Sequence, residues 1–278
     1  MRRFFTVSIF IAGVFTLAAE TSVAFEEASL LAETNAETIL PEPENAENEQ
    51  KVSGPKFQIN VQAITVVRPK FEGSDRYSAS FVPMLNLQYG PVFASMTQGL
   101  GIYVPANESR TLIFIPSLHV RPKRKLGEDT RIGDLRPTAN LHTTMRFEQF
   151  SLNLRVSEGI ASDNSGALCT FGAGWNRRVA DKTWLGLTAS ATCGDGAYNR
   201  AYFGISENES AEHGYDVYKP SAGFKSVEAV GAFRHILTEK VSLDLALRFT
   251  HLTGQAAKSP IVSERNQLLS VLIATYRF

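Results

Sequence analysis

The residues with the greatest chemical potential are five histidines: His119, His142, His213, His235 and His251. Their spacing contains no H-x-H, H-x₃-H or H-E-x-x-H pattern of the kind that brings imidazoles onto one metal ion. The sequence also lacks the G-x-S-x-G turn that presents a nucleophilic serine. We therefore predict no catalytic residues, no cofactor and no metal site. A hydrolase that assembles Ser, His and Asp from different strands stays open as an alternative.

Two polar clusters suit ion binding. Glu72-Gly73-Ser74-Asp75 offers oxygens to a cation, although a glycine between acidic residues is more typical of a structural turn, which is the interpretation we favour. A basic cluster lies at the predicted 122–135 loop: Arg121, Lys123, Arg124 and Lys125. It either pairs with phosphates of the outer leaflet or, as we favour, forms a solvated charged loop.

The N-terminal residues indicate export. Residues 1–24 combine a basic start, a short apolar stretch and Ser22-Val23-Ala24, which predicts a signal peptide cleaved after Ala24; an uncleaved membrane anchor is the alternative. Residues 25–54 hold eight Glu and one Lys, a net charge of −7, and are interpreted as an acidic disordered linker. The remaining residues, 55–278, carry a net charge of +6. The chain as a whole has zero net charge, but an acidic segment precedes a mildly basic one. Bulk positive charge for nucleic acid is absent, and we expect no nucleic-acid partner.

From residue 56 onward the hydrophobic pattern has a period of two. Residues 241–250 and 150–157 place apolar side chains on one face and polar or charged side chains on the other. A dry core rejects such a polar face, whereas a water-filled lumen accepts it, and the apolar face then needs lipid or a second sheet to cover it. His142 alternates onto the polar face and is predicted to point into the lumen.

Eleven segments follow this pattern: 56–67, 79–89, 92–104, 111–121, 136–147, 150–160, 168–178, 183–194, 220–234, 240–252 and 268–278. Short links near 148–149, 179–182 and 235–239 alternate with long ones, as periplasmic turns and outer loops do in membrane barrels. A closed antiparallel barrel needs an even number, and the alternation of links breaks between residues 89 and 122. We therefore predict an all-β, transmembrane antiparallel β-barrel of about twelve strands over 55–278, with one strand missed or merged there; ten strands is the alternative. Gly99-Leu100-Gly101 in this stretch predicts a bend or close packing rather than a nucleotide-binding loop.

The two cysteines flank a predicted hairpin. With its turn centred between residues 180 and 181, residue 178 faces 184 and Cys169 faces Cys193. Outside the cytoplasm such a pair is able to form a disulfide where the geometry allows. We predict a Cys169–Cys193 bond, and two unpaired thiols are the alternative.

The chain ends on an alternating strand with Tyr276 and the terminal Phe278 on one face, which is similar to the C-terminal signal of outer-membrane barrels. A soluble β-sandwich that happens to end in Phe is the alternative.

A resemblance to a known family runs through most of this region. Residues 68–77, RPKFEGSDRY, resemble the P-x-Y-E-G-S-D-x-Y segment of the MipA/OmpV family, which comprises MltA-interacting proteins and related outer-membrane proteins. The matching motif residues are Pro69, Glu72, Gly73, Ser74, Asp75, Tyr77, Phe203, Gly204, Ser259, Pro260, Ile261 and Val262. Phe71 stands where the family commonly has Tyr, and residues 122–170 match weakly.

The resemblance implies a location in the Gram-negative outer membrane, in contact with its lipid and lipopolysaccharide. The best-described member resembles a scaffold that joins a lytic transglycosylase, a murein hydrolase, to a penicillin-binding murein polymerase. We expect a similar non-enzymatic role here, with the periplasmic turns and the acidic linker as partner surfaces. The alternatives are a small channel that passes solutes and a lipid-acting barrel enzyme.

Overall fold

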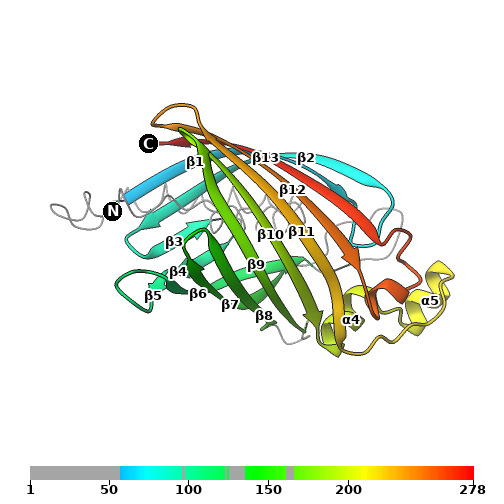
Figure 1. The fold of residues 1–278 in the computed structure, drawn as a ribbon. Helices are drawn as coiled ribbons and strands as arrows, with labels where there is room; N and C mark the ends of the chain where they lie inside the picture. The colour runs from blue at the N-terminus through cyan, green and yellow to red at the C-terminus, as the bar shows by residue number, and fades with distance from the viewer. Residues whose placement is uncertain (1–56, 96–97, 123, 125–134, 161–165) are drawn as a thin grey trace, which may run out of the picture.

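The computed structural model describes residues 57–95, 98–122, 124, 135–160 and 166–278, and these form one barrel of long, tilted strands (Figure 1). The predicted signal peptide with its Ala24 cleavage site and the acidic linker over 25–54 lie outside the described residues. No helix among the described residues is long and apolar enough to span a membrane.

Antiparallel strands make up most of the described chain. The strands are β1 (Phe57–Pro69), β2 (Tyr77–Tyr89), β3 (Val92–Ser95), β4 (Gly99–Ile102), β5 (Val104–Pro105), β6 (Leu112–Pro122), β7 (Leu135–Phe147), β8 (Phe150–Gly159), β9 (Ala167–Ala180), β10 (Thr183–Gly194), β11 (Gly223–Ile236), β12 (Val241–Leu252) and β13 (Asn266–Arg277). Two short α-helices, α4 (Gly196–Phe203) and α5 (Glu207–His213), and the 3₁₀-helix η2 (Ala256–Lys258) lie in the connections.

The sheet closes on itself. Apart from β4 and β5, which do not pair with each other, each strand pairs with its sequence neighbours. β1 pairs with β13, and β4 pairs with β6 through Leu100–Leu118 and Gly101–Ser117. Strands β4 and β5 follow one another along the same edge of β6 and are interrupted only at Tyr103, so they form two parts of one strand. The barrel therefore has twelve strands. The predicted count is confirmed, and the merged pair is β3 and β4 within the predicted 92–104 segment.

Alternation of side chains decides which residues face the interior. On β12, Leu245, Leu247 and Phe249 point outward and are 40–47% exposed. Between them, Asp244 and Arg248 point inward and are 2% and 7% exposed. The prediction of an apolar outer face and polar inward positions is confirmed on this strand.

The interior has two unlike walls. Strands β6 to β10 turn Ser, Thr, Asn, His and Arg side chains inward, as expected. The opposite wall, formed by β1, β2 and β11 to β13, instead contributes a buried apolar cluster: Ile64, Val66, Val82, Met84, Val230, Ala246, Leu269, Val271 and Ile273. The interior is therefore not polar on all sides, because the inward side chains of this wall pack as a hydrophobic core.

Outward-facing aromatic side chains gather near both ends of the barrel. At the end where β1 begins and β13 finishes, which we name the inner end, the exposed aromatics are Phe57, Tyr89, Phe147, Phe150, Tyr276 and Phe278. Toward the opposite or outer end they are Tyr77, Phe81, Phe171 and Phe224. Two aromatic girdles around an apolar band are typical of barrels inserted in an outer membrane. Tyr276 and Phe278 share the outward face as predicted, with ring centroids 4.8 Å apart.

The connections set the orientation. Turns at 90–91, 148–149, 181–182 and 237–240 are short and lie at the inner end, whereas the long connections at 70–76, 195–222 and 253–265 lie at the outer end. Barrels in outer membranes place short turns in the periplasm and long loops outside. The inner end is therefore the periplasmic end.

The register across the β9–β10 hairpin places Cys193 directly opposite Cys169, as predicted. The turn itself lies at Asp181 and Lys182, one residue later than expected, and a bulge at Thr183/Trp184 restores the predicted pairing of Trp184 with Arg178. Both cysteines are free thiols in the structure, so the bond between them stays a prediction.

We expect the exported protein, unfolded without reductant, to resist thiol labelling, because facing cysteines on neighbouring strands oxidise outside the cytoplasm. Reduction should then release two labelled thiols, and a Cys169→Ser variant should show one thiol without reduction. Two labelled thiols in the unreduced wild-type protein would rule out the bond.

Candidate functional site at the outer end of the barrel

Residues that we predicted to match the family motif are far apart in sequence but meet at the outer end of the barrel. The 70–76 connection, α4 and the residues after η2 form a compact cap there, which we name the outer cap (Figure 1). It draws on the segments around residues 72–77, 203–204 and 259–262.

The 70–76 connection is bound tightly to the segment before β13. Gly73 has a φ of +102°, and a Cβ atom at this position would stand 2.6 Å from Cγ2 of Val262. Its carbonyl oxygen accepts hydrogen bonds from the amides of Ser263 and Glu264, at 2.8 and 3.0 Å. Only glycine fits both the left-handed backbone and this close approach.

Three further bonds anchor the same connection. The side-chain nitrogen Nε2 of Gln267 donates to the carbonyl oxygen of Ser74 at 3.2 Å, and the Tyr77 hydroxyl accepts from the backbone amide of Leu268 at 3.1 Å. Glu72 pairs with Lys225 of β11 at 2.5 Å. The structural interpretation of the Glu72–Asp75 run is thereby supported, since Glu72 is engaged by a lysine.

Helix α4 packs over the mouth of the barrel. Phe203 and Tyr198 are buried against Leu252, Ala256 and Ala257. The Ser259 hydroxyl donates to the carbonyl oxygen of Phe203 at 2.6 Å, which ties the end of α4 to the residues after η2. Ile261 is 4% exposed, whereas Asp75 and Pro260 are exposed and take no part in this packing.

The two α-helices were not predicted, although each carries a start signal. Asp195 caps α4, with its carboxylate accepting from the Tyr198 amide, and Ser206 with Glu209 forms a capping box at α5. The S-x-x-E spacing was the available signal. It was overlooked because the helices are only eight and seven residues long and lie inside a long connection.

Arg124 links α5 to the barrel. Its guanidinium donates to the Gly204 carbonyl oxygen at 2.8 Å and to the Glu209 carboxylate at 3.0 Å. Burial acts to raise the pKa of Glu209, but the Ser206 amide and hydroxyl and the charge of Arg124 outweigh it, so the pKa lies below its ordinary value. Burial also lowers the pKa of Arg124, which Glu209 partly offsets.

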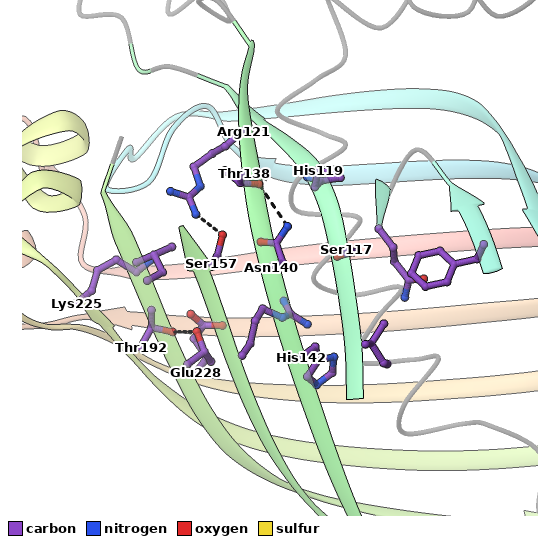
Figure 2. A pocket seen from close by; sticks show the side chains of 16 residues that line it. Ser117, His119, Arg121, Thr138, Asn140, His142, Ser157, Thr192, Lys225 and Glu228 are labelled. Carbon is purple, nitrogen blue, oxygen red and sulfur yellow. Dashed lines mark hydrogen bonds between the residues drawn. The ribbon is translucent and has the colours of Figure 1, made fainter. Parts of the chain in front are cut away.

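A cavity of about 110 Å³ lies in the barrel interior beneath the outer cap (Figure 2). Its lining comes from β3, the β3–β4 link and β6 to β11: Phe93, Gln98, Ile115, Ser117, His119, Arg121, Thr138, Asn140, His142, Arg155, Ser157, Leu168, Thr170, Thr192, Lys225 and Glu228. His142, 6% exposed, points inward as predicted.

The placement of Arg121 corrects the expectation for the basic cluster. Instead of joining an outer loop, Arg121 lies in β6, points inward and is 3% exposed. It donates to the Ser157 hydroxyl at 2.5 Å, and its guanidinium carbon lies 5.3 Å from the centroid of the Tyr198 ring. Arg124 is engaged by α5, and Lys123 and Lys125 lie outside the described residues. The inward position follows from strand alternation, since Arg121 is the last residue of the predicted 111–121 strand and lies on the same face as Ser117 and His119.

The inward-facing positions of the described strands are strongly basic. They carry these cations: Arg68, Arg121, Arg136, Arg146, Arg155, Arg178, Lys225, Arg234, Arg248 and Arg277. The inward carboxylates on the same strands are Glu228 and Asp244. Arg234 pairs with Asp244, and Arg248 lies 3.9 Å from Glu228.

The metal-ligating residue types do not gather: among the described residues, no group of three or more His, Cys, Asp or Glu is placed to hold a metal ion. The closed barrel, its apolar outer band and its two aromatic girdles instead define an outer-membrane β-barrel protein.

Comparison with known families identifies the chain further. A profile of the family described as "MltA-interacting protein MipA" matches residues 62–278, and the chain belongs to this family. No curated protein matches the chain.

Several solved barrels are similar in outline. The NanC porin has a TM-score of 0.43 at 8% identity, over 78% of this chain and 100% of that one. The outer membrane channel DcaP of Acinetobacter baumannii has a TM-score of 0.39 at 11% identity, over 81% and 97%. The translocator domain of the autotransporter NalP from Neisseria meningitidis has a TM-score of 0.38 at 11% identity, over 94% and 99%. These likenesses carry no argument about what the chain does.

Replacing Gly99 should weaken closure of the barrel. Gly99 has a φ of +74°, and a Cβ atom there would stand 1.9 Å from the Leu118 carbonyl oxygen of β6. We expect Gly99→Ala to lower the free energy of unfolding by about 2–3 kcal/mol, measured by urea unfolding in detergent micelles. Gly231→Ala is the control, because its Cβ would meet only Leu187 Cδ2 at 3.9 Å, and it should be neutral or slightly stabilising. If both variants lost the same free energy of unfolding, the close approach of Gly99 to the Leu118 carbonyl would not be what stabilises closure.

Docking of α5 should weaken in acid. The pKa of the Glu209 carboxyl is lower in the folded protein than in the unfolded chain, where it is about 4.3. Such a carboxyl stabilises the folded state at pH values above the unfolded pKa. This stabilisation is lost as the pH falls through the folded pKa. Hydrogen exchange of residues 204–216, corrected for intrinsic rates, should therefore accelerate below about pH 4. Glu209→Gln should exchange faster at neutral pH and lose this pH response, whereas Glu207→Gln, at an exposed position, should behave as wild type. An unchanged response in Glu209→Gln would exclude Glu209 as its origin.

Proposed function

We propose that this protein is a non-enzymatic scaffold of the outer membrane that links a murein hydrolase to a murein polymerase. The observation that carries the proposal is the match to the family of MltA-interacting proteins over nearly the whole barrel. In this role the outer cap faces lipopolysaccharide, and the partners bind from the periplasm.

The inner end supplies the surface that such partners would meet. Its short turns present exposed charges of both signs: Glu148, Asp181, Lys182, Glu239 and Lys240. β1 starts at the same end, so the acidic linker that precedes it along the chain joins the barrel there. Charge complementarity at such a surface governs which partner binds and how fast.

Binding to a purified lytic transglycosylase of the MltA class tests the proposal. We expect the mature protein in detergent to bind it, and the double swap Glu239→Lys with Lys240→Glu to weaken binding about three- to tenfold without altering net charge. The matched control swaps an exposed pair in the 195–222 connection at the outer end, Glu207→Lys with Lys219→Glu, whose charged atoms lie 3.7 Å apart. This control should leave the affinity unchanged.

Two results would overturn the scaffold role. One is an affinity no higher than that of an unrelated outer-membrane barrel. The other is weakening by the outer-cap swap as large as that by the inner-end swap. Absence of binding together with stepwise conductance in planar bilayers would favour the channel alternative.

A further inference from the structure

The outer half of β2 has an edge that no described strand covers. All 13 residues of β2 pair with β1, but only Asn86–Tyr89 pair with β3. The other edge of Tyr77–Leu85 therefore has no neighbour among the described strands. The cause is that β3 and β4 are only four residues long each, whereas β2 continues beyond them toward the outer end (Figure 1). We name the uncovered side of Tyr77–Leu85 the free edge.

The register shows which backbone groups point out of the free edge. The Phe278 amide donates to the Ile59 carbonyl oxygen, so odd-numbered residues of β1 bond to β13 and even-numbered ones bond to β2. Even-numbered residues of β1 pair with even-numbered residues of β2, so the odd-numbered residues of β2 point their backbone groups the other way. Along the free edge these residues are Tyr77, Ala79, Phe81, Pro83 and Leu85.

The free edge suits its depth in the membrane. Tyr77 and Phe81 belong to the outer aromatic girdle, where water reaches backbone groups. Deeper in the wall Pro83 has no N–H to leave unpaired, and a proline on an edge also limits how far another strand can pair. Leu85 adjoins the end of β3. The result is a short row of donors and acceptors close to the membrane surface, centred on Ala79 and Phe81.

An extended polypeptide strand is the partner that this row fits. Its N–H and C=O groups repeat at the same two-residue spacing as those of Ala79 and Phe81, which the hydrocarbon chain of a lipid does not offer. A side chain opposite Phe81 would point outward with it, and Phe81 is 67% exposed, so apolar residues suit such positions. The positions between them would lie beside the inward-facing Ser78 and Ser80, where small polar residues fit.

A second copy of this chain does not fit the free edge. Two copies inserted in one membrane are related by an axis along the membrane normal, so their β2 strands run in the same direction. Barrel strands tilt by about 35–45° from that normal, and the tilts are opposite where two barrels touch. The two edges would therefore cross at a steep angle instead of forming a ladder.

We propose that the free edge binds an extended segment of another polypeptide by strand addition opposite Tyr77–Phe81. The segment alternates apolar with small polar residues. Residues 25–54 of this chain, with eight Glu, contain no five-residue stretch of that kind. The free edge lies in the outer half of the barrel, whereas the scaffold partners are assigned to the inner end, so either proposal can fail without the other.

Hydrogen exchange of the mature protein in detergent, followed residue by residue by NMR, tests the free edge. We expect the amides of Ala79 and Phe81 to exchange at least about tenfold faster than those of Ser80 and Val82, which bond to β1. Equal protection of all four amides would overturn the proposal, because the edge would then be covered within the protein. Residues 25–54 would be the cover if their deletion removed the protection, and a second copy if dilution removed it.

A synthetic peptide of sequence KTVTVTVTK is the probe for strand addition. Added to the mature protein, it should slow exchange of the Ala79 and Phe81 amides about tenfold at saturation and leave Ser80 and Val82 unchanged. The control is the same peptide N-methylated at its valines, whose N–H groups would face β2. It should give no protection, because it has no donors for the ladder.

Variants at two positions locate the binding. Ala79→Pro removes an N–H that bonds to no described strand, so the variant should fold but bind the peptide about tenfold more weakly. Ala79→Val is the matched control, since it keeps the N–H and should bind as wild type. Pro83→Ala adds a donor to the free edge and should strengthen binding about threefold. Folding of each variant is checked by its heat-modifiable electrophoretic mobility.

Three further results would overturn the proposal: no saturable protection by the peptide up to millimolar concentration, equal protection by the methylated peptide, or equal binding by Ala79→Pro and Ala79→Val. The first two need no variant, so a variant that fails to fold does not leave the question open.

Discussion

A sheet inside a lipid bilayer has to pair its edge strands, because no water is present to satisfy their amide and carbonyl groups. In this protein that requirement falls on β4 and β6, whose direct pairing is only two residue pairs long. Gly99 and Gly101 make the pairing possible, since a Cβ atom at Gly99 would overlap the Leu118 carbonyl and one at Gly101 would stand 2.8 Å from Ser117 Cβ. Closure here fixes which side chains face lipid and which face the interior in every other strand.

Because the barrel is closed, the charged side chains that point inward along its strands are enclosed in its interior. A buried cation is costly unless it is paired or hydrogen-bonded, and the interior meets this condition in different ways on its two walls. On β11 and β12, Arg234 and Arg248 face Asp244 and Glu228 beside the apolar cluster. On the other wall, Arg121 of β6 and Arg155 of β8 line a cavity together with hydroxyl and amide groups. The division gives the barrel a packed half and a polar half.

The residues predicted to match the family motif lie mainly at the outer end of the barrel. Gly73, Ser74, Ser259 and Phe203 contribute a left-handed turn, three carbonyl acceptors and a buried hydroxyl donor, and none of them lies near the periplasmic turns. The periplasmic surface, where scaffold partners would bind, is the part that the motif constrains least, so family membership alone does not specify the partner.

Much of the fold followed from the sequence, because a period of two is a local property: the side chains at 241–250 alternate whatever lies beside them. The same locality predicted the hairpin register that opposes Cys169 and Cys193, and the inward position of His142. The sequence did not show that β3 and β4 are separate strands, since what separates them is that β3 pairs back onto β2 while β4 pairs with β3 and with the distant β6. Nor did it show the outer cap, the apolar wall or the cavity, because each is formed by residues brought together from distant strands. Those features were decided by the tertiary structure, through the single long-range condition that the sheet must close.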